Sequence, residues 1–194
     1  MLPEELLYPA AFYDGHAFLY ERASGYSSSY FGGPTSIRLT GLRHGPRPLH
    51  HMMTLNWDAI AGIEKQGYSS LSLFYGMCYS GCTMTYQIEE TYRSRLLELE
   101  PRKSSADWPY SGFPKLLPYV PLRVARRVPC SAEQFRELLI QHGEVKADDV
   151  TVIIPPMFDL GISLWGHSGD AEGVQIVFQL DVEKRRVRVY NECT

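Results

Sequence analysis

The sequence predicts an α+β protein: a single domain dominated by a curved antiparallel β-sheet, with one or two short helices. Segments in which apolar and polar residues alternate recur along the chain, and this is the pattern of strands with one buried face. Prolines are scattered through the connections between these segments, which leaves little room for long helices. A chain of 194 residues, at about 150 per domain, indicates one compact unit spanning 1–194.

The most regular alternation lies near the C-terminal end. In Gly173–Val182 every second residue is apolar, and after a charged turn at 183–185 the valines Val187 and Val189 alternate with arginines. This pattern predicts an antiparallel hairpin with one face in solvent. The other expected strands are Ala17–Arg22, Ser36–Thr40, Leu49–Asn56, Ser69–Tyr75, Met84–Glu89, Ser94–Leu99, Tyr119–Val128 and Val150–Ile154.

One helix is expected to open at Ser131. Gln134 stands three residues later, so that each side chain can accept the other residue's free backbone N–H. Phe135, Leu138, Leu139 and His142 would then share one face, and Gly143 would end the helix. A second, shorter helix is expected after Trp57, ending before Gly67.

The net charge and the N-terminal residues exclude several classes of protein. Nineteen Lys and Arg against 22 Asp and Glu give a net charge of −3, which argues against nucleic acid as the main partner. Met1–Asp14 carries carboxylates where a secretory signal is basic, and no run approaches the roughly 18 apolar residues of a membrane span. We therefore expect a cytoplasmic protein without membrane association. Its four cysteines are expected to be reduced thiols, several of them buried.

The adjacent histidines His50 and His51 suggest a metal site, but their spacing speaks against one. Neighbouring residues on a strand point to opposite faces, so the two rings cannot easily bind one ion. Cys78 and Cys82 lack a second cysteine pair at zinc-finger spacing. We therefore expect no metal and no cofactor, with one histidine on the core face bonded to backbone and its neighbour exposed.

An enzymatic alternative stays open. The sequence has no G-x-S-x-G elbow around a nucleophile, and no phosphate-binding glycine loop. His167 and Asp170 lie close together between two strand-like segments, and a cleft there with His50 or His51 would suit a small-molecule or metal-dependent enzyme. A third alternative is a regulatory domain that forms homodimers. No catalytic residue is assigned.

The strongest functional signal is the distribution of the 13 tyrosines. They concentrate in segments rich in serine and glycine, at 24–33, 75–82 and 104–113. Stiff, half-polar rings among Ser and Gly are typical of surfaces that bind proteins, although any one segment could instead pack its rings into the core. The expected anchors are Tyr26, Tyr30, Phe31, Tyr79, Trp108, Tyr110 and Phe113, and the expected steering charges are Glu89, Glu90, Asp107, Asp170 and Glu172.

Several of these segments also resemble a known family. Tyr30–Pro34, Pro48–Asn56 and Gly67–Tyr75 resemble the YwqG-like family, a bacterial domain of unknown function with an F-G-G-x-P turn, a strand of the Q-L-N or T-L-N kind and a strand ending in aromatics. Gly169–Phe178 is similar to the G-D-x-G segment before that family's last hairpin. The resemblance implies an α+β fold dominated by antiparallel sheet and no established catalytic residues. It also implies a link to immunity proteins, because family members occur beside bacterial toxins.

These observations together predict a non-enzymatic protein-binding module. Its sharpest form is a cytosolic bacterial immunity protein that occludes a cognate toxin: aromatic anchors fill the toxin's cleft, and carboxylates pair with basic residues around it.

Overall fold

The computed structural model describes residues 1–42, 49–56, 60, 70–77, 81–90, 92–101, 116–141, 143–157, 160 and 173–193. The strands are β1 (Ala10–Tyr13), β2 (His16–Arg22), β3 (Ser29–Phe31), β4 (Arg38–Gly41), β5 (His50–Asn56), β6 (Ser70–Tyr75), β7 (Cys82–Glu90), β8 (Arg93–Pro101), β9 (Val120–Pro129), β10 (Val150–Ile154), β11 (Gln175–Asp181) and β12 (Arg186–Glu192). The helix α1 (Ala132–Arg136) lies between β9 and β10.

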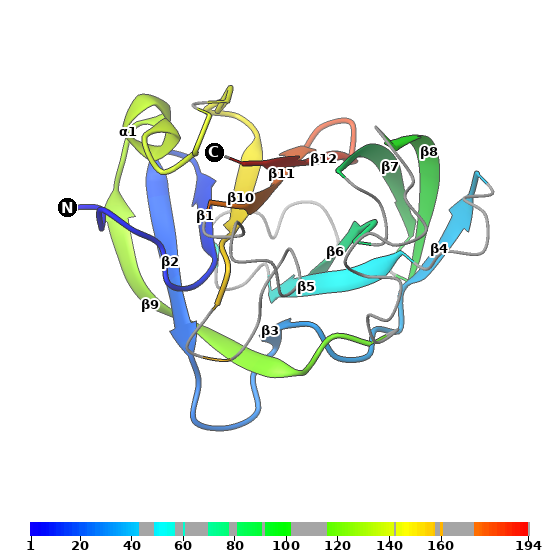
Figure 1. The fold of residues 1–194 in the computed structure, drawn as a ribbon, viewed down its shortest axis with the longest axis horizontal. Coiled ribbons are helices and arrows are strands. Elements are labelled where there is room, and N and C mark those ends of the chain that lie inside the picture. Colours follow the sequence, from blue (N-terminus) through cyan, green and yellow to red (C-terminus); the bar gives the residue numbers. More distant parts are fainter. Residues whose placement is uncertain are drawn as a thin grey trace.

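Within these residues the strands form one 12-stranded sheet in the order β4-β8-β7-β12-β11-β10-β1-β2-β9-β3-β5-β6. The neighbouring strands pair antiparallel, except that β4 and β8 run parallel. Figure 1 shows that the sheet is strongly curved. Irregular pairing in β2–β9, β5–β6 and β7–β8 contributes to this curvature, because an extra residue bends a strand and increases its twist.

The curvature brings β6, the last strand of the sheet, against β7 and β12. The Tyr86 hydroxyl of β7 accepts a hydrogen bond of 3.3 Å from the Phe74 backbone N–H, and the two rings meet edge to face. The Tyr75 hydroxyl of β6 donates to the Asn191 side chain and accepts from the Cys82 backbone N–H. The sheet thus encloses a core between strands that are distant in its hydrogen-bonding order.

Two apolar cores form, one on each face of the sheet. The larger lies inside the curve and includes Phe18, Met53, Tyr86 and Phe178. The smaller lies on the outer face, where α1 and the N-terminal segment cover β1, β10 and β11; Phe12 and Phe135 meet there at 5.3 Å between ring centroids. Consecutive residues of β10 and β11 are therefore buried on both faces.

The expected fold class is wrong, because the described structure is essentially all-β. Its helix spans only Ala132–Arg136, whereas the sequence predicts a helix that continues to Gly143. The capping box is as expected: the Ser131 hydroxyl accepts from the Gln134 N–H, and the Gln134 side chain accepts from the Ser131 N–H.

Buried side chains of the sheet explain why the helix ends early. The backbone N–H of Ile140 donates to the Gln175 side chain, and that of Gln141 donates to the Glu192 carboxylate. Gln175 also donates to the Leu138 carbonyl. Because these bonds satisfy backbone groups that a longer helix would pair internally, the chain turns along β11 and β12 instead.

The C-terminal hairpin is confirmed as β11 and β12, joined by a turn at 182–185. The expectation that one face of this hairpin lies in solvent is correct for β12, where Arg186 and Arg188 are exposed. It is wrong for β11, because α1 helps to bury Val177 on the outer face. The eight other expected strands are present as β2 and β4–β10, apart from shifts at their ends. The strands β1 and β3 are additions. The expected second helix lies outside the described residues, apart from Ile60, which is buried. No helix among the described residues has the length and apolar character to cross a membrane.

Candidate functional site

Exposed aromatic and apolar side chains lie on two segments that are distant in the chain and adjacent in the fold. The first segment connects β2 to β3, and the second leads into β9. The Ala23 backbone N–H donates to the Pro121 carbonyl at 2.9 Å, and β3 then pairs with the start of β9. This arrangement fixes residues 23–31 beside residues 117–122.

Three of the exposed large apolar side chains in the described structure lie on these two segments. Tyr26 is 90% exposed, Leu116 60% and Tyr119 42%. Tyr30 is half-buried next to them, with its ring centroid 5.2 Å from that of Tyr119. We call Tyr26, Tyr30, Leu116 and Tyr119 the tyrosine surface.

Hydrogen bonds hold two rings of the tyrosine surface in place. The Tyr30 hydroxyl donates to the Pro34 carbonyl at 3.2 Å, and the Tyr119 hydroxyl donates to the Ser27 carbonyl at 3.4 Å. The Tyr30 ring also meets the His51 ring edge-on at 5.7 Å. These rings are therefore oriented before any partner arrives.

The serines beside Tyr26 anchor the backbone. The Ser27 hydroxyl donates to the Leu122 carbonyl, the Ser28 hydroxyl accepts from the Asn56 side chain at 2.7 Å, and the Ser29 hydroxyl accepts from the Asn56 backbone N–H at 3.0 Å. These serines therefore tie the segment to β5 and β9.

A pair of glycines places the second segment against the first. Gly32 and Gly33 have φ values of +61° and +66°, in the left-handed region that side chains with a Cβ rarely adopt. The Gly32 N–H donates to the Met52 carbonyl, and the Gly33 N–H donates to the Leu117 carbonyl. A Cβ on Gly32 would overlap the Pro118 carbonyl oxygen, and one on Gly33 would lie 2.9 Å from the Tyr119 ring. The turn therefore needs glycine at both positions.

The expected anchors are only partly found on this surface. Tyr26 and Tyr30 belong to it, but Phe31 is completely buried in the larger core and is withdrawn as an anchor. The residues Tyr79, Asp107, Trp108, Tyr110, Phe113, His167, Asp170 and Glu172 lie outside the described residues.

The two described steering charges are neutralised within the chain itself. Glu89 accepts from Arg93 at 2.9 Å and from Arg95 at 2.8 Å, and Glu90 accepts from Arg93 at 2.8 Å. These residues lie on β7 and β8, whereas the tyrosine surface is built from the β2–β3 connection and the chain around the start of β9. They are therefore not part of it.

Both histidines of β5 are buried, so the expectation that one would be exposed is wrong. His51 is bonded to backbone as expected, through Nδ1 and the Gly33 carbonyl at 3.3 Å. Its Nε2 lies 2.9 Å from the Thr54 hydroxyl. Burial lowers the pKa of His51 below its ordinary value, although the nearby carbonyls oppose this shift. Within the described residues, no three His, Cys, Asp or Glu side chains are arranged to hold a metal ion.

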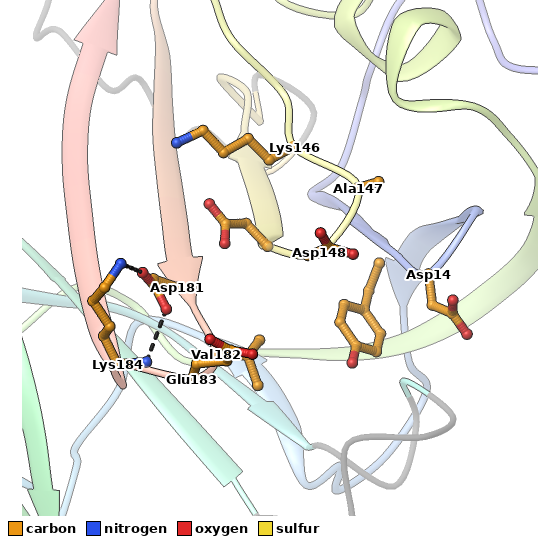
Figure 2. A pocket seen from close by; sticks show the side chains of 10 residues that line it. Asp14, Lys146, Ala147, Asp148, Asp181, Val182, Glu183 and Lys184 are labelled. Carbon is orange, nitrogen blue, oxygen red and sulfur yellow. Dashed lines mark hydrogen bonds and ion pairs between the residues drawn. The ribbon is translucent and has the colours of Figure 1, made fainter.

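An acidic hollow of about 500 Å³ lies between the β1–β2 turn, residues 146–149 and the β11–β12 turn (Figure 2). Asp181 accepts from the backbone and the ammonium group of Lys184, and these bonds lower its pKa. Burial, and then the charge of Asp181, raise the pKa of Asp149. The hollow is lined by Tyr13, Asp14, Lys146, Ala147, Asp148, Asp149, Asp181, Val182, Glu183 and Lys184.

Sequence reasoning missed Tyr119 and Leu116. Tyr119 was assigned to the start of a strand, and Leu116 has no serine or glycine beside it to mark a binding loop. Their position in the chain is the signal that could have identified them. Leu116 and Tyr119 directly follow the segment that contains Trp108, Tyr110 and Phe113, and they precede a strand.

Comparisons with protein-family models, with curated proteins and with solved structures found no match to this chain.

Proposed function

We propose that this chain is a non-enzymatic protein-binding module and that the tyrosine surface binds its partner. The observation that supports this function is that Tyr26, Leu116 and Tyr119, all exposed, lie on two segments that are distant in sequence and are joined by backbone hydrogen bonds. Scattered exposed apolar residues need no explanation, but a group of them is typical of an interaction site.

Pre-organisation supports the same proposal. Tyrosine buries a large area at low entropic cost, and rings that are already oriented lose little freedom on binding. The anchored serines and the adjoining, tilted rings of Tyr30 and Tyr119 meet this requirement. The enzymatic alternative has less support. Its candidate histidine His51 is buried, and both of its ring nitrogens already bond to groups of the chain.

In the specific form of the proposal, the chain is a cytoplasmic bacterial immunity protein that occludes a toxin. Its support is the resemblance of Tyr30–Pro34 and neighbouring segments to the YwqG-like family, together with the net charge of −3, which suits a basic target. Glu89 and Glu90 have no part in this form, since arginines already pair with them.

The test compares variants that remove exposed tyrosines at two places. The tagged chain captures its partner from native lysate, and the purified partner is then titrated against wild type and the double variant Tyr26→Ser/Tyr119→Ser. Tyr92→Ser is the matched control, because Tyr92 is 66% exposed but lies in the connection between β7 and β8.

We expect the double variant to lose about 2 kcal/mol or more of affinity, roughly 30-fold, as at a binding hot spot. Tyr92→Ser should bind like wild type. Equal affinity of the double variant and wild type, or no protein captured above background, would overturn the proposal.

A further inference from the structure

A chain of buried hydrogen bonds starts at His51, directly behind the tyrosine surface. Nε2 of His51 lies 2.9 Å from the Thr54 hydroxyl, which lies 3.2 Å from that of Ser72. The Ser72 hydroxyl lies 3.3 Å from that of Thr35. The chain thus links β5 and β6 to the segment that follows the glycine turn.

The two ends of this chain determine where its protons lie. At one end the Gly33 carbonyl can only accept, so Nδ1 of His51 carries the proton and the neutral ring leaves Nε2 as an acceptor. At the other end the Ile37 N–H donates to the Thr35 hydroxyl at 3.1 Å. Each hydroxyl then has one orientation that satisfies its neighbours: Thr35 donates to Ser72, Ser72 to Thr54, and Thr54 to Nε2.

The surroundings of His51 favour its neutral form. The ring is 6% exposed and lies between Tyr30 and Phe74, with centroids at 5.7 and 5.8 Å. Tyr30 is the titratable group that faces it from β3; β6 contributes Phe74 and the Ser72 hydroxyl, and the turn contributes carbonyl oxygens. No ion pair joins the His51 ring to any described residue.

A second proton on His51 would disturb this arrangement. It would sit on Nε2, where it would point at the proton that Thr54 donates, so the Thr54 hydroxyl would have to turn away from Nε2. The Thr54 proton could then stay paired within the chain only if Ser72 and Thr35 reversed as well. Thr35, at the far end of the chain, is only half-buried. The charged ring would also lie against the Tyr30 and Phe74 rings without a carboxylate partner among the described residues, which is costly in a buried site.

We propose that His51 is a positioning residue for the tyrosine surface: its neutral ring holds Tyr30 and the glycine turn in their binding geometry, and acid releases them. The effect of His51 on binding rests on the proposed function, in which the tyrosine surface binds a partner. The coupling between His51 and Tyr30 is a property of the chain alone and is measured without a partner.

The partner-free experiment is an NMR titration of the full chain from about pH 7.5 to pH 4.5, following histidine and tyrosine ring signals. We expect His51 to titrate below the ordinary histidine range, with the Tyr30 and Tyr119 signals changing in the same step. His16 is an internal control, because its Nδ1 bonds to the Asp14 carbonyl in the β1–β2 turn, away from these rings.

The variant His51→Gln keeps an amide donor and acceptor but cannot become charged. Its Tyr30 and Tyr119 signals should stay constant over the same pH range, with circular dichroism confirming that both proteins are folded. If the tyrosine signals ignore the His51 step in wild type, or change equally in His51→Gln, the coupling is refuted. If His51→Gln does not fold, the wild-type titration alone tests the coupling, because the tyrosine signals should change with the His51 step and not with the His16 step.

A second arm measures binding of the captured partner at about pH 7.5 and at about one pH unit below the His51 midpoint that the NMR titration gives. Wild type should lose about tenfold more affinity than His51→Gln between these conditions, because only about a tenth of the chains then keep His51 neutral and able to bind. Equal losses would refute the role of His51 in binding. Failure to capture a partner counts against the proposed function, while the NMR result still decides the coupling.

Discussion

Substitution of Gly32 by alanine tests how the tyrosine surface is built, and Gly15 provides a matched control. Both glycines have left-handed φ values, +61° for Gly32 and +68° for Gly15. A Cβ on Gly15 would meet no atom within 4 Å, whereas one on Gly32 would overlap the Pro118 carbonyl oxygen. The two variants therefore share the backbone strain and differ in the contact.

The expected losses of stability follow from these contacts. Gly15→Ala should lower the free energy of unfolding by about 1 kcal/mol, the cost of a left-handed residue with a Cβ. Gly32→Ala adds displacement of residues 117–119 and loss of the Gly33 N–H bond to the Leu117 carbonyl. An unpaired buried group costs about 1 to 3 kcal/mol, so the total should be about 3 kcal/mol.

The assay is urea unfolding followed by circular dichroism, and the NMR signals of Tyr30 and Tyr119 are recorded in parallel. The Tyr119 signals should shift in Gly32→Ala and stay in place in Gly15→Ala. Equal stability losses in the two variants, or unchanged Tyr119 signals in Gly32→Ala, would refute this account of the glycine turn.

Three further predictions concern the rest of the fold. Gln175→Ala leaves the Ile140 N–H and the Leu138 carbonyl without their partner, and should cost about 2 to 4 kcal/mol in urea unfolding; a loss below that of Gln87→Ala, whose half-buried side chain donates to the turn carbonyls of Lys184 and Arg185, would contradict the explanation of the short helix. Phe135→Ala removes the buried side chain of α1 from Phe12 and should cost about 3 to 5 kcal/mol by the same assay; a change under about 1 kcal/mol would show that α1 does not seal the outer core. Burial raises the pKa of Cys82 to about 11, whereas Cys193 is exposed, so at pH 8 a thiol reagent with peptide mapping should label Cys193 before Cys82. Equal labelling rates in the folded protein would contradict the burial of Cys82.

Strands with one buried face could be predicted from the sequence because their apolar residues recur with period 2. In the first half of β12, from Arg186 to Val189, charged and apolar residues alternate strictly, and this period identifies a strand without knowledge of its neighbours. β1 was missed for the opposite reason. Ala11 faces the larger core while Ala10 and Phe12 face the smaller one, so its sequence AAFY has no alternation.

The helix length and the surface position could not be predicted locally. Ser131 and Gln134 determine where α1 begins, but it ends because Gln175 and Glu192 bond to the backbone N–H groups of Ile140 and Gln141, which lie 35 and 51 residues earlier in the chain. The Ser/Gly/Tyr composition points to Tyr26 and Tyr30, which lie on the tyrosine surface. It gave no indication that Phe31 would turn inward or that Tyr119 would join them, since both depend on the pairing of β3 with β9.

Site-specific photo-crosslinking tests the central proposal most directly. A photoreactive phenylalanine analogue replaces Tyr26 in one protein and Tyr92 in another, and each is irradiated in native lysate and analysed by mass spectrometry. If the tyrosine surface binds a partner, the Tyr26 position should yield one dominant crosslinked protein that the Tyr92 position does not. No crosslink at Tyr26, or the same products from both positions, would contradict the proposal.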